Sequence, residues 1–245
     1  MLLPIGIQLR ASAVTRWGEK PEELKTLLAQ RQLTFVALSS GVVSFDPAKE
    51  ADTIALHTAN AKFLRDAGGL YLQVVDERPR GRVIEPDDYR RMGRLLTEIG
   101  RRTSDLGIPL GYHNHMGNLG QAPDEVARVL DAADARYVKL ELDIAHYQAA
   151  GGDPVAAVTQ HAGRLLFVHV KDLQRPRPGG ASNSYRFVEI GNGSVNVLGV
   201  LHALAKVGFD GWAIVELDEV TDASKTPASS AQIAKKFLES NGFTL

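Results

Sequence analysis

Several kinds of residue and segment are missing from this sequence, and each absence narrows the functions that it can have. The 245 residues include no cysteine, which excludes disulfide bonds, thiolate metal ligands and cysteine nucleophiles. No uninterrupted apolar run approaches the roughly 20 residues that a membrane-spanning helix needs. The apolar segment from Met1 to Leu9 has neither a basic region nor a cleavage pattern. We therefore interpret it as a first strand and expect a cytoplasmic protein.

The chain also has almost no net charge. Its 28 Lys and Arg residues nearly balance 29 Asp and Glu residues, which gives a formal net charge of -1. A chain without a basic excess has no general attraction for nucleic acid or for an anionic membrane surface. Hydrophobic residues make up 44% and charged residues 23%, as in ordinary globular proteins. We therefore expect a small molecule as the binding partner, and neither nucleic acid nor a membrane.

What the sequence does contain is a regular alternation of strand-like and helical segments. Apolar segments predict strands over residues 5–9, 34–38, 70–75, 109–112, 137–142, 165–170, 187–190 and 212–217. Helical spacing predicts helices over residues 21–32, 47–67, 86–106, 123–133, 153–164, 195–207 and 227–240. Such alternation is typical of parallel strands covered by helices.

The number of these units predicts the fold class, an α/β protein of the (β/α)8 TIM barrel type. About eight units of roughly 31 residues match the typical size of that barrel. We expect one domain over residues 1–245. A doubly wound open sheet is the alternative, but no glycine-rich dinucleotide or phosphate loop follows any strand.

Ionisable residues gather at the predicted carboxyl ends of the strands, whereas the strand starts are apolar or bounded by glycine. These residues are Asp76, Glu77, His113, His115, Asp143, His146, His169, Lys171, Asp172, Glu216 and Asp218. In a TIM barrel the active site lies at this end of the strands. A sheet with a purely structural role has no reason to collect charge at one end, so the pattern predicts a functional site there.

The strongest signal comes from two successive strands between Val138 and Asp172. Because side chains alternate across a strand, Glu141 and Asp143 share one face of the first strand. His169 and Lys171 share one face of the second for the same reason. If the strands are parallel neighbours, carboxylates and an imidazole converge at one end of the sheet.

Asp143, His169 and Glu216 form a mixed oxygen and nitrogen ligand set for a divalent metal. Such a set suits Mn2+, Mg2+, Co2+ or Zn2+ and does not choose among them. Each residue also has a structural explanation: a core histidine for His169, a helix cap for Asp143 and an ion pair with Lys171 for Glu216. Their joint occurrence at strand ends is harder to explain without a site.

A fourth metal ligand is expected from His113, His115 or Glu141. The segment Tyr112-His113-Asn114-His115 places two histidines at alternate positions, and both cannot be ideal ligands. We take His113 as the fourth ligand and expect His115 to bind substrate through hydrogen bonds.

Five motifs in this order and spacing resemble the sugar phosphate isomerase/epimerase family, whose members have a xylose isomerase-like TIM barrel. They are YHNH (112–115), ELDIAH (141–146), GRLLFVHVKD (163–172), FVEIGNGSVN (187–196) and GWAIVELD (211–218). The resemblance implies the same barrel and a divalent metal bound by Asp143, His169 and Glu216. It also implies that His146 and Arg175 contact the substrate. Relatives in the family are often dimers, so the resemblance suggests a homodimer.

The chain departs from the family's epimerases at their first metal-binding glutamate. Epimerases have Glu-Asn-His where this chain has His113-Asn114-His115. Of the two glutamates that move the proton in epimerases, only Glu216 is therefore matched. YHNH and the Met-Gly that follows it look more like the inosose dehydratase-type branch.

We therefore expect a metal-dependent enzyme that removes a proton beside a metal-polarised carbonyl of a small keto-sugar or keto-polyol. Glu216 is expected to be the general base and His113 or His115 its partner acid, while Lys171 neutralises charge that develops on oxygen. Isomerisation or epimerisation is the first expectation, and dehydration through the same enediolate, a hydro-lyase reaction, is the alternative.

Two other classes of function compete with this expectation. A sugar-binding barrel without catalysis need not keep Asp143, His169 and Glu216 together. A nuclease of the endonuclease IV type needs more metal-binding residues and a basic surface, which seven histidines and a net charge of -1 do not provide.

Overall fold

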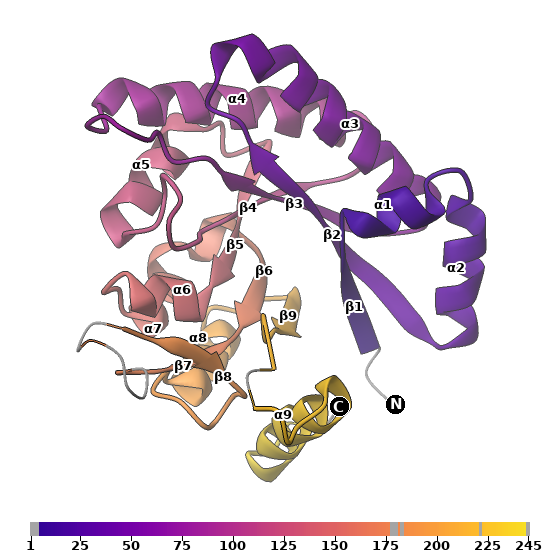
Figure 1. Cartoon of the computed structure of the whole chain (residues 1–245), viewed down its shortest axis with the longest axis vertical. Coiled ribbons are helices and arrows are strands. Elements are labelled where there is room, and N and C mark those ends of the chain that lie inside the picture. Colours follow the sequence, from indigo (N-terminus) through magenta and orange to yellow (C-terminus); the bar gives the residue numbers. More distant parts are fainter. Residues whose placement is uncertain (1–4, 177–180, 182–183, 221, 244–245) are drawn as a thin grey trace. The chain divides into compact units, whose positions relative to one another are not determined.

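A computed structural model describes the chain except for residues 1–4, 177–180, 182–183, 221 and 244–245. The chain forms two compact units, residues 4–141 and residues 142–245, and each is described by itself. In both units strands and helices alternate along the sequence (Figure 1). The predicted α/β class is thus confirmed, whereas the prediction of one domain stays a prediction.

The N-terminal unit contains a parallel sheet in which strands adjacent in sequence are also adjacent in space. Its strands are β1 (Ile5–Arg10), β2 (Leu33–Val43), β3 (Tyr71–Asp76), β4 (Leu110–His113) and the first part of β5 (Val138–Asp143). Its helices are α1 (Ser12–Trp17), α2 (Pro21–Gln30), the short 3-10 helix η1 (Pro47–Lys49), α3 (Glu50–Asp66), α4 (Pro86–Ser104) and α5 (Pro123–Ala132). In Figure 1, α3 and α4 run side by side along the sheet.

Local sequence chemistry explains where these elements begin and why they pack. Proline occupies the first turn of α2, α4 and α5, where its missing N–H costs no hydrogen bond. A capping box formed by Glu85 and Asp88 starts α4. Strand residues such as Val36, Val74 and Leu140 are fully buried, as expected for a parallel sheet covered by helices.

The C-terminal unit contains a parallel pair of strands and an antiparallel ribbon. In the parallel pair, β6 (Leu165–Val170) lies beside β9 (Trp212–Val215). The ribbon consists of β7 (Asp172–Gln174) and β8 (Arg186–Val188). The helices are α6 (Ile144–Ala149), α7 (Pro154–Gln160), the 3-10 helix η2 (Ala162–Arg164), α8 (Val197–Lys206) and α9 (Pro227–Ser240).

The structure differs from the sequence prediction at several short elements. The strand expected over residues 187–190 begins at Arg186 and runs antiparallel to β7, which was not predicted. Helix α6 was also missed, because six residues are too few for a periodic signal. Part of the segment that joins β7 to β8 lies outside the described residues. No helix among the described residues is long and apolar enough to cross a membrane.

A buried carboxyl group at the end of β3 fastens the segment that follows β4. Asp76 Oδ2 accepts hydrogen bonds from Tyr112 Oη and from the backbone N–H of Gly120, each at 2.9 Å. The side chain is 1% exposed. Burial raises the pKa of Asp76 to about 6, against the opposing effect of these hydrogen bonds. Asp76 therefore holds in place the loop that contains His115.

The raised pKa of Asp76 predicts a pH-dependent contribution to stability. Its folded value of about 6 lies above the ordinary 3.8, so on acidification the folded state takes up the proton before the unfolded state does. The stability of wild-type protein relative to Asp76→Asn should therefore rise between about pH 7.5 and about pH 4. The difference of roughly two between the folded and the ordinary pKa of Asp76 corresponds to about 3 kcal/mol in the free energy of unfolding. Urea unfolding of both proteins at several pH values measures this difference.

The comparison with Asp76→Asn separates this effect from other titrating groups. Burial lowers the pKa of His57 to about 4, so that histidine reduces stability over the same acid range in both proteins. A difference in unfolding free energy that is independent of pH would contradict the account of Asp76.

Candidate functional site

Three residues predicted as metal ligands meet inside the C-terminal unit. Asp143 is the last residue of β5, His169 lies near the end of β6, and Glu216 follows β9. The backbone N–H of Glu216 donates to Val170 O at 3.1 Å, which continues the β6–β9 pairing. This pairing brings Glu216 to the side of His169.

The imidazole of His169 is the centre of this ligand set. Its Nδ1 lies 2.9 Å from Glu216 Oε2 and 3.7 Å from Asp143 Oδ2. Asp143 Oδ1 accepts the backbone N–H groups of Ala145 and His146, at 2.9 and 2.8 Å, and so caps α6. One Asp143 oxygen thus starts the helix while the other faces His169. Asp143 can therefore cap α6 and contact His169 at the same time.

Lys171 joins the same group as an enclosed cation, with a side chain only 1% exposed. Its Nζ lies 2.8 Å from both Glu216 Oε2 and Asp218 Oδ1. The distances from Nζ to Asp143 Oδ2 and to His146 Nε2 are each 3.4 Å. We call Asp143, His169, Lys171, Glu216 and Asp218 the carboxylate cluster.

Electrostatics keep opposite charges on Lys171 and Glu216. Burial lowers the pKa of Lys171, but the charges of Asp143, Glu216 and Asp218 outweigh it and raise the pKa above its ordinary value. Burial raises the pKa of Glu216, but the hydrogen bond from His169 and the charges of His169 and Lys171 bring it well below its ordinary value. At neutral pH the site therefore holds an ammonium beside a carboxylate.

A ring cluster formed by the β7–β8 ribbon lies against this site. The Lys171 ammonium lies over the ring of Phe187, 4.5 Å from its centroid. The rings of His146 and Phe187 meet edge to face, with 4.9 Å between their centroids. Tyr185 packs against Phe187, and the Arg175 guanidinium lies over Tyr185 at 5.5 Å. Arg175 also donates a hydrogen bond to the backbone of Ala149.

A single carboxylate fixes the base of this ribbon. Asp172 Oδ1 accepts the backbone N–H groups of Leu173 and Val195, at 2.8 and 2.9 Å. Asp172 Oδ2 accepts those of Gly191 and Gly193, at 3.0 and 2.9 Å. The start of β7 and the loop after β8 are thus tied to one buried side chain. The sequence signal for this loop was Gly191-Asn192-Gly193 in the motif FVEIGNGSVN, but that pattern does not show that Asp172 binds the loop.

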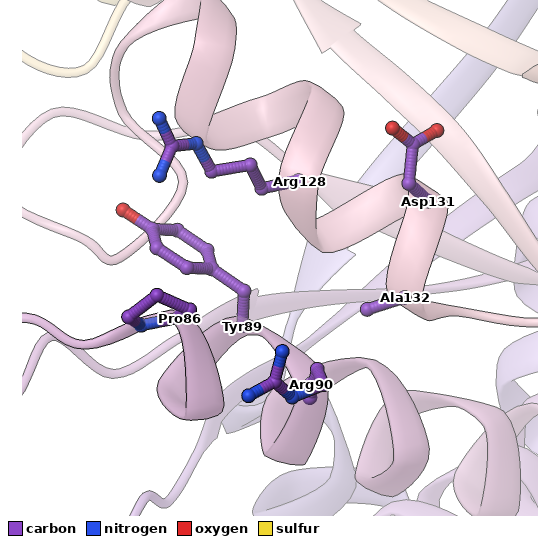
Figure 2. A pocket seen from close by; sticks show the side chains of 6 residues that line it. All are labelled: Pro86, Tyr89, Arg90, Arg128, Asp131 and Ala132. Carbon is purple, nitrogen blue, oxygen red and sulfur yellow. The ribbon is translucent and has the colours of Figure 1, made fainter.

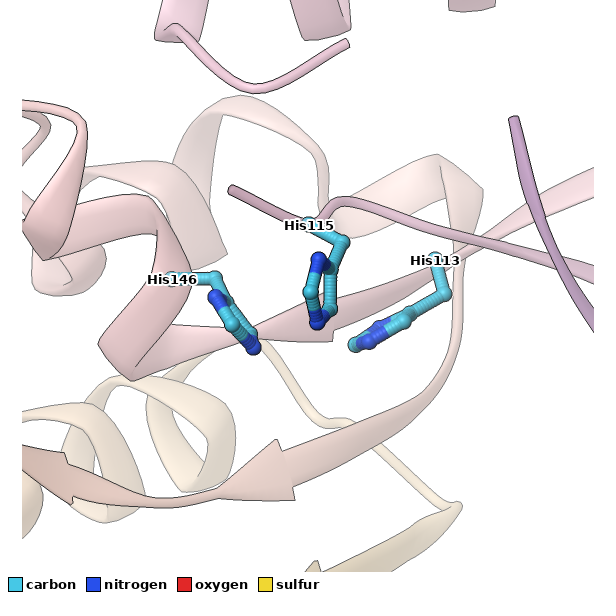
Figure 3. Close-up of side chains that lie close together, drawn as sticks. All are labelled: His113, His115 and His146. Atoms are coloured by element: carbon cyan, nitrogen blue, oxygen red, sulfur yellow. The ribbon is translucent and has the colours of Figure 1, made fainter. Parts of the chain in front are cut away.

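Two other predicted residues, His113 and His115, belong to the N-terminal unit. Their rings meet edge to face with centroids 5.6 Å apart (Figure 3). His113 Nδ1 lies 3.7 Å from Glu141 Oε1, and His115 Nδ1 donates to Met116 O at 2.7 Å. His113, His115 and Glu141 were the candidates for a fourth ligand, and that assignment stays a prediction.

The predicted residue His146 lies in the first turn of α6, three residues after Asp143 (Figure 3). Its side chain is 2% exposed, and its Nε2 lies 3.9 Å from Asp143 Oδ2. Contacts with the carboxylate cluster and with Phe187 thus place His146 at the border between the charged groups and the rings.

A pocket of about 370 Å³ opens between α4 and α5 (Figure 2). It is lined by Pro86, Tyr89, Arg90, Arg128, Asp131 and Ala132. Arg128 lies over the Tyr89 ring and forms an ion pair with Asp124 at 3.2 Å. None of the predicted site residues lines this pocket, and its two arginines are paired with the neighbouring Asp87 and Asp124.

Comparison with known proteins identifies the family and several relatives. The family model described as xylose isomerase-like TIM barrel matches residues 5–240. The rhizopine catabolism protein MocC of Rhizobium meliloti is 34% identical over 157 residues, 60% of this chain and 47% of that protein. An inosose dehydratase of Lacticaseibacillus casei is 26% identical over 249 residues, 91% of this chain and 82% of that protein. The chain thus spans about half of MocC and most of the dehydratase.

Solved structures agree on the fold. The IolI protein, determined with a bound zinc atom, superposes with a TM-score of 0.81 at 18% identity, covering 98% of this chain and 90% of IolI. A sugar phosphate isomerase/epimerase from Parabacteroides distasonis superposes with a TM-score of 0.79 at 16% identity, covering 98% of this chain and 89% of that one. The predicted TIM barrel and family resemblance are confirmed.

The bonding of Asp172 predicts that Gly193 accepts no side chain. A Cβ atom at Gly193 would overlap Asp172 Oδ1 and the carbonyl oxygen of Leu173. Gly193→Ala should therefore lower the free energy of unfolding by roughly 1–3 kcal/mol. Gly163→Ala is the matched control, because a Cβ there meets nothing within 4 Å. Urea denaturation compares the variants, and equal unfolding midpoints would contradict the account.

Proposed function

Because the chain belongs to the xylose isomerase-like TIM barrel family, we propose that it is an enzyme that removes a proton beside the carbonyl of a small keto-polyol. The observation that carries the proposal is the carboxylate cluster, in which a carboxylate, an imidazole and an ammonium converge within hydrogen-bonding distance. Such groups are the ones that acid–base chemistry at a carbonyl requires.

Asp143, His169 and Glu216 are the residues that would hold a divalent metal ion. Their fit is chemical: two carboxylate oxygens approach the same imidazole nitrogen, at 2.9 and 3.7 Å, and no thiol competes. The three carboxylates of the cluster also exceed its single lysine, so an added cation would improve the charge balance. When bound, the ion would polarise the substrate's carbonyl. Mn2+, Mg2+, Co2+ and Zn2+ all suit this donor set.

Glu216 is the proposed general base. Its side chain is 27% exposed, whereas that of Asp143 is fully buried, so of the two carboxylates beside His169 it is Glu216 that a substrate can reach. The low pKa of Glu216 keeps it deprotonated at neutral pH, the state that a general base must have before it accepts a proton. Lys171 stays charged beside it and would neutralise negative charge that develops on the substrate oxygen.

Removal of the proton is the same first step in both reactions. The step that follows it decides whether the enzyme is a dehydratase or an isomerase. If the neighbouring carbon loses its hydroxyl group as water, a carbon–carbon double bond forms and the enzyme is a dehydratase. If a proton returns to either carbon of the enediolate, the enzyme is an isomerase or epimerase. Both outcomes use Glu216 in the same way.

We favour dehydration of a keto-polyol over the isomerisation that was expected first. Support comes from the inosose dehydratase that aligns over 91% of this chain. A histidine at position 113 also leaves Glu216 without the second glutamate of a symmetric epimerase. Isomerisation is the second candidate, supported by the five motifs that the chain shares with that family. His113 as partner acid, and His115, His146 and Arg175 as substrate-binding residues, belong to the proposal in either case.

Solvent exchange tests the proposed function. The protein, supplied with Mn2+, is incubated in D2O with a panel of ketoses, inosose and their phosphates. We expect deuterium to enter one carbon of one substrate, and Glu216→Gln to reduce the rate at least about 100-fold. Glu219→Gln is the matched control, since Glu219 lies three residues later and is exposed. NMR of the products separates a dehydrated ketone from an isomer. Absence of both deuterium exchange and dehydrated product across the panel would contradict the proposal.

Metal analysis tests the ligand set independently of activity. We expect His169→Gln to lose at least about tenfold in affinity for Mn2+ or Zn2+, because an imidazole is removed from the centre of the set. His202→Gln, a change at an exposed histidine of α8, should bind metal like wild type. Equal metal content of all three proteins after dialysis would contradict the assignment.

A further inference from the structure

The Lys171 ammonium is enclosed by carboxylates, an imidazole and an aromatic ring. An ammonium has three N–H donors. Two of them face Glu216 Oε2 and Asp218 Oδ1, each at 2.8 Å. Nζ also lies 3.4 Å from both Asp143 Oδ2 and His146 Nε2, which are the acceptors left for the third N–H. The remaining surface of the cation meets the ring of Phe187, with 4.5 Å between Nζ and the ring centroid.

Phe187 thereby covers the Lys171 ammonium with an aromatic face. An aromatic face attracts a cation, and the attraction is strongest where water is excluded. Lys171 is 1% exposed, so this contact belongs to the strong kind. Without the ring, water would reach the ammonium and weaken its interaction with Glu216.

The same ring also fixes a second polar side chain. The His146 and Phe187 rings meet edge to face with centroids 4.9 Å apart and an interplanar angle of 72°. Such a geometry is favourable for aromatic pairs and restricts rotation of the imidazole. Phe187 therefore contacts two of the residues to which the proposed reaction assigns roles.

The position of Phe187 is itself determined by the ribbon. Phe187 pairs with Leu173 across β7 and β8. The Asp172 carboxylate binds four backbone N–H groups on both sides of that pairing. The ring of Tyr185, which directly precedes β8, packs against the ring of Phe187 with 5.4 Å between their centroids. The ring is thus held by the backbone, independently of Lys171.

We propose that Phe187 is a positioning residue of the active site: its ring closes the Lys171 ammonium against water and holds Lys171 and His146 in place beside Glu216. The role rests on the function proposed above. Phe187 itself takes no part in proton transfer. Its effect reaches the substrate through Lys171, so it should change the turnover number more than the Michaelis constant.

Kinetics of four variants test the role of Phe187. Phe187→Leu removes the aromatic face and should lower kcat for deuterium exchange about 30-fold, the size of a desolvated cation–π contact. Phe187→Tyr keeps the face and should retain wild-type kcat. In a Lys171→Met background, Phe187→Leu should cause a much smaller loss, because only the contact with the His146 ring is then left to remove. Phe243→Leu is the matched control, because that ring lies against His202 instead.

A spectroscopic test needs no activity and keeps the two proposals distinguishable. In protein with 13C-labelled lysine, the Lys171 ε-CH2 signal, identified by its absence in Lys171→Met, should lie upfield of exposed lysines because of the Phe187 ring current. Phe187→Leu should abolish this displacement, and Phe187→Tyr should preserve it. Circular dichroism confirms that the variants fold. A wild-type signal at the position of exposed lysines, or losses from Phe187→Leu and Lys171→Met that multiply, would overturn the proposal. If the wild type exchanges no proton, the function fails alone and the signal still decides the role of Phe187.

Discussion

The physical constraint on which the C-terminal unit depends is the burial of one ammonium among three carboxylates. Removing Lys171 from water carries a large free-energy cost, which only close opposite charges offset. Glu216 and Asp218 at 2.8 Å provide that compensation. The chain must therefore bring the ends of β6 and β9 together, and the parallel pairing that continues to Glu216 does so. The arrangement that satisfies Lys171 also gathers the proposed metal ligands.

Much of this site was predictable from the sequence, because strand alternation is a short-range property. Side chains two residues apart share a face, so His169 and Lys171 had to point the same way once β6 was recognised. Asp143 and Glu216 follow from the rule that barrel sites lie at the carboxyl ends of strands. The same reasoning explains why Asp143 and His169 lie 3.7 Å apart although 26 positions separate them in the chain.

What the sequence did not reveal depends on contacts between distant segments. Asp172 looks like one more strand-end acid, yet its oxygens accept four backbone N–H groups, three of them 19 to 23 residues away. Nothing in the local pattern distinguishes a carboxylate that binds a loop from one that binds a ligand. Phe187 likewise stands in a three-residue strand, too short to show which face carries it. Its contact with Lys171 follows from the antiparallel ribbon, whose first strand was not expected.

The central claim is that Asp143, His169 and Glu216 together bind one divalent cation. The most direct measurement is anomalous X-ray diffraction from crystals grown with Mn2+, recorded on both sides of the manganese absorption edge. We expect one strong anomalous peak at about 2 Å from oxygens of Asp143 and Glu216 and from a nitrogen of His169. A protein saturated with Mn2+ whose anomalous peaks all lie elsewhere would contradict the claim.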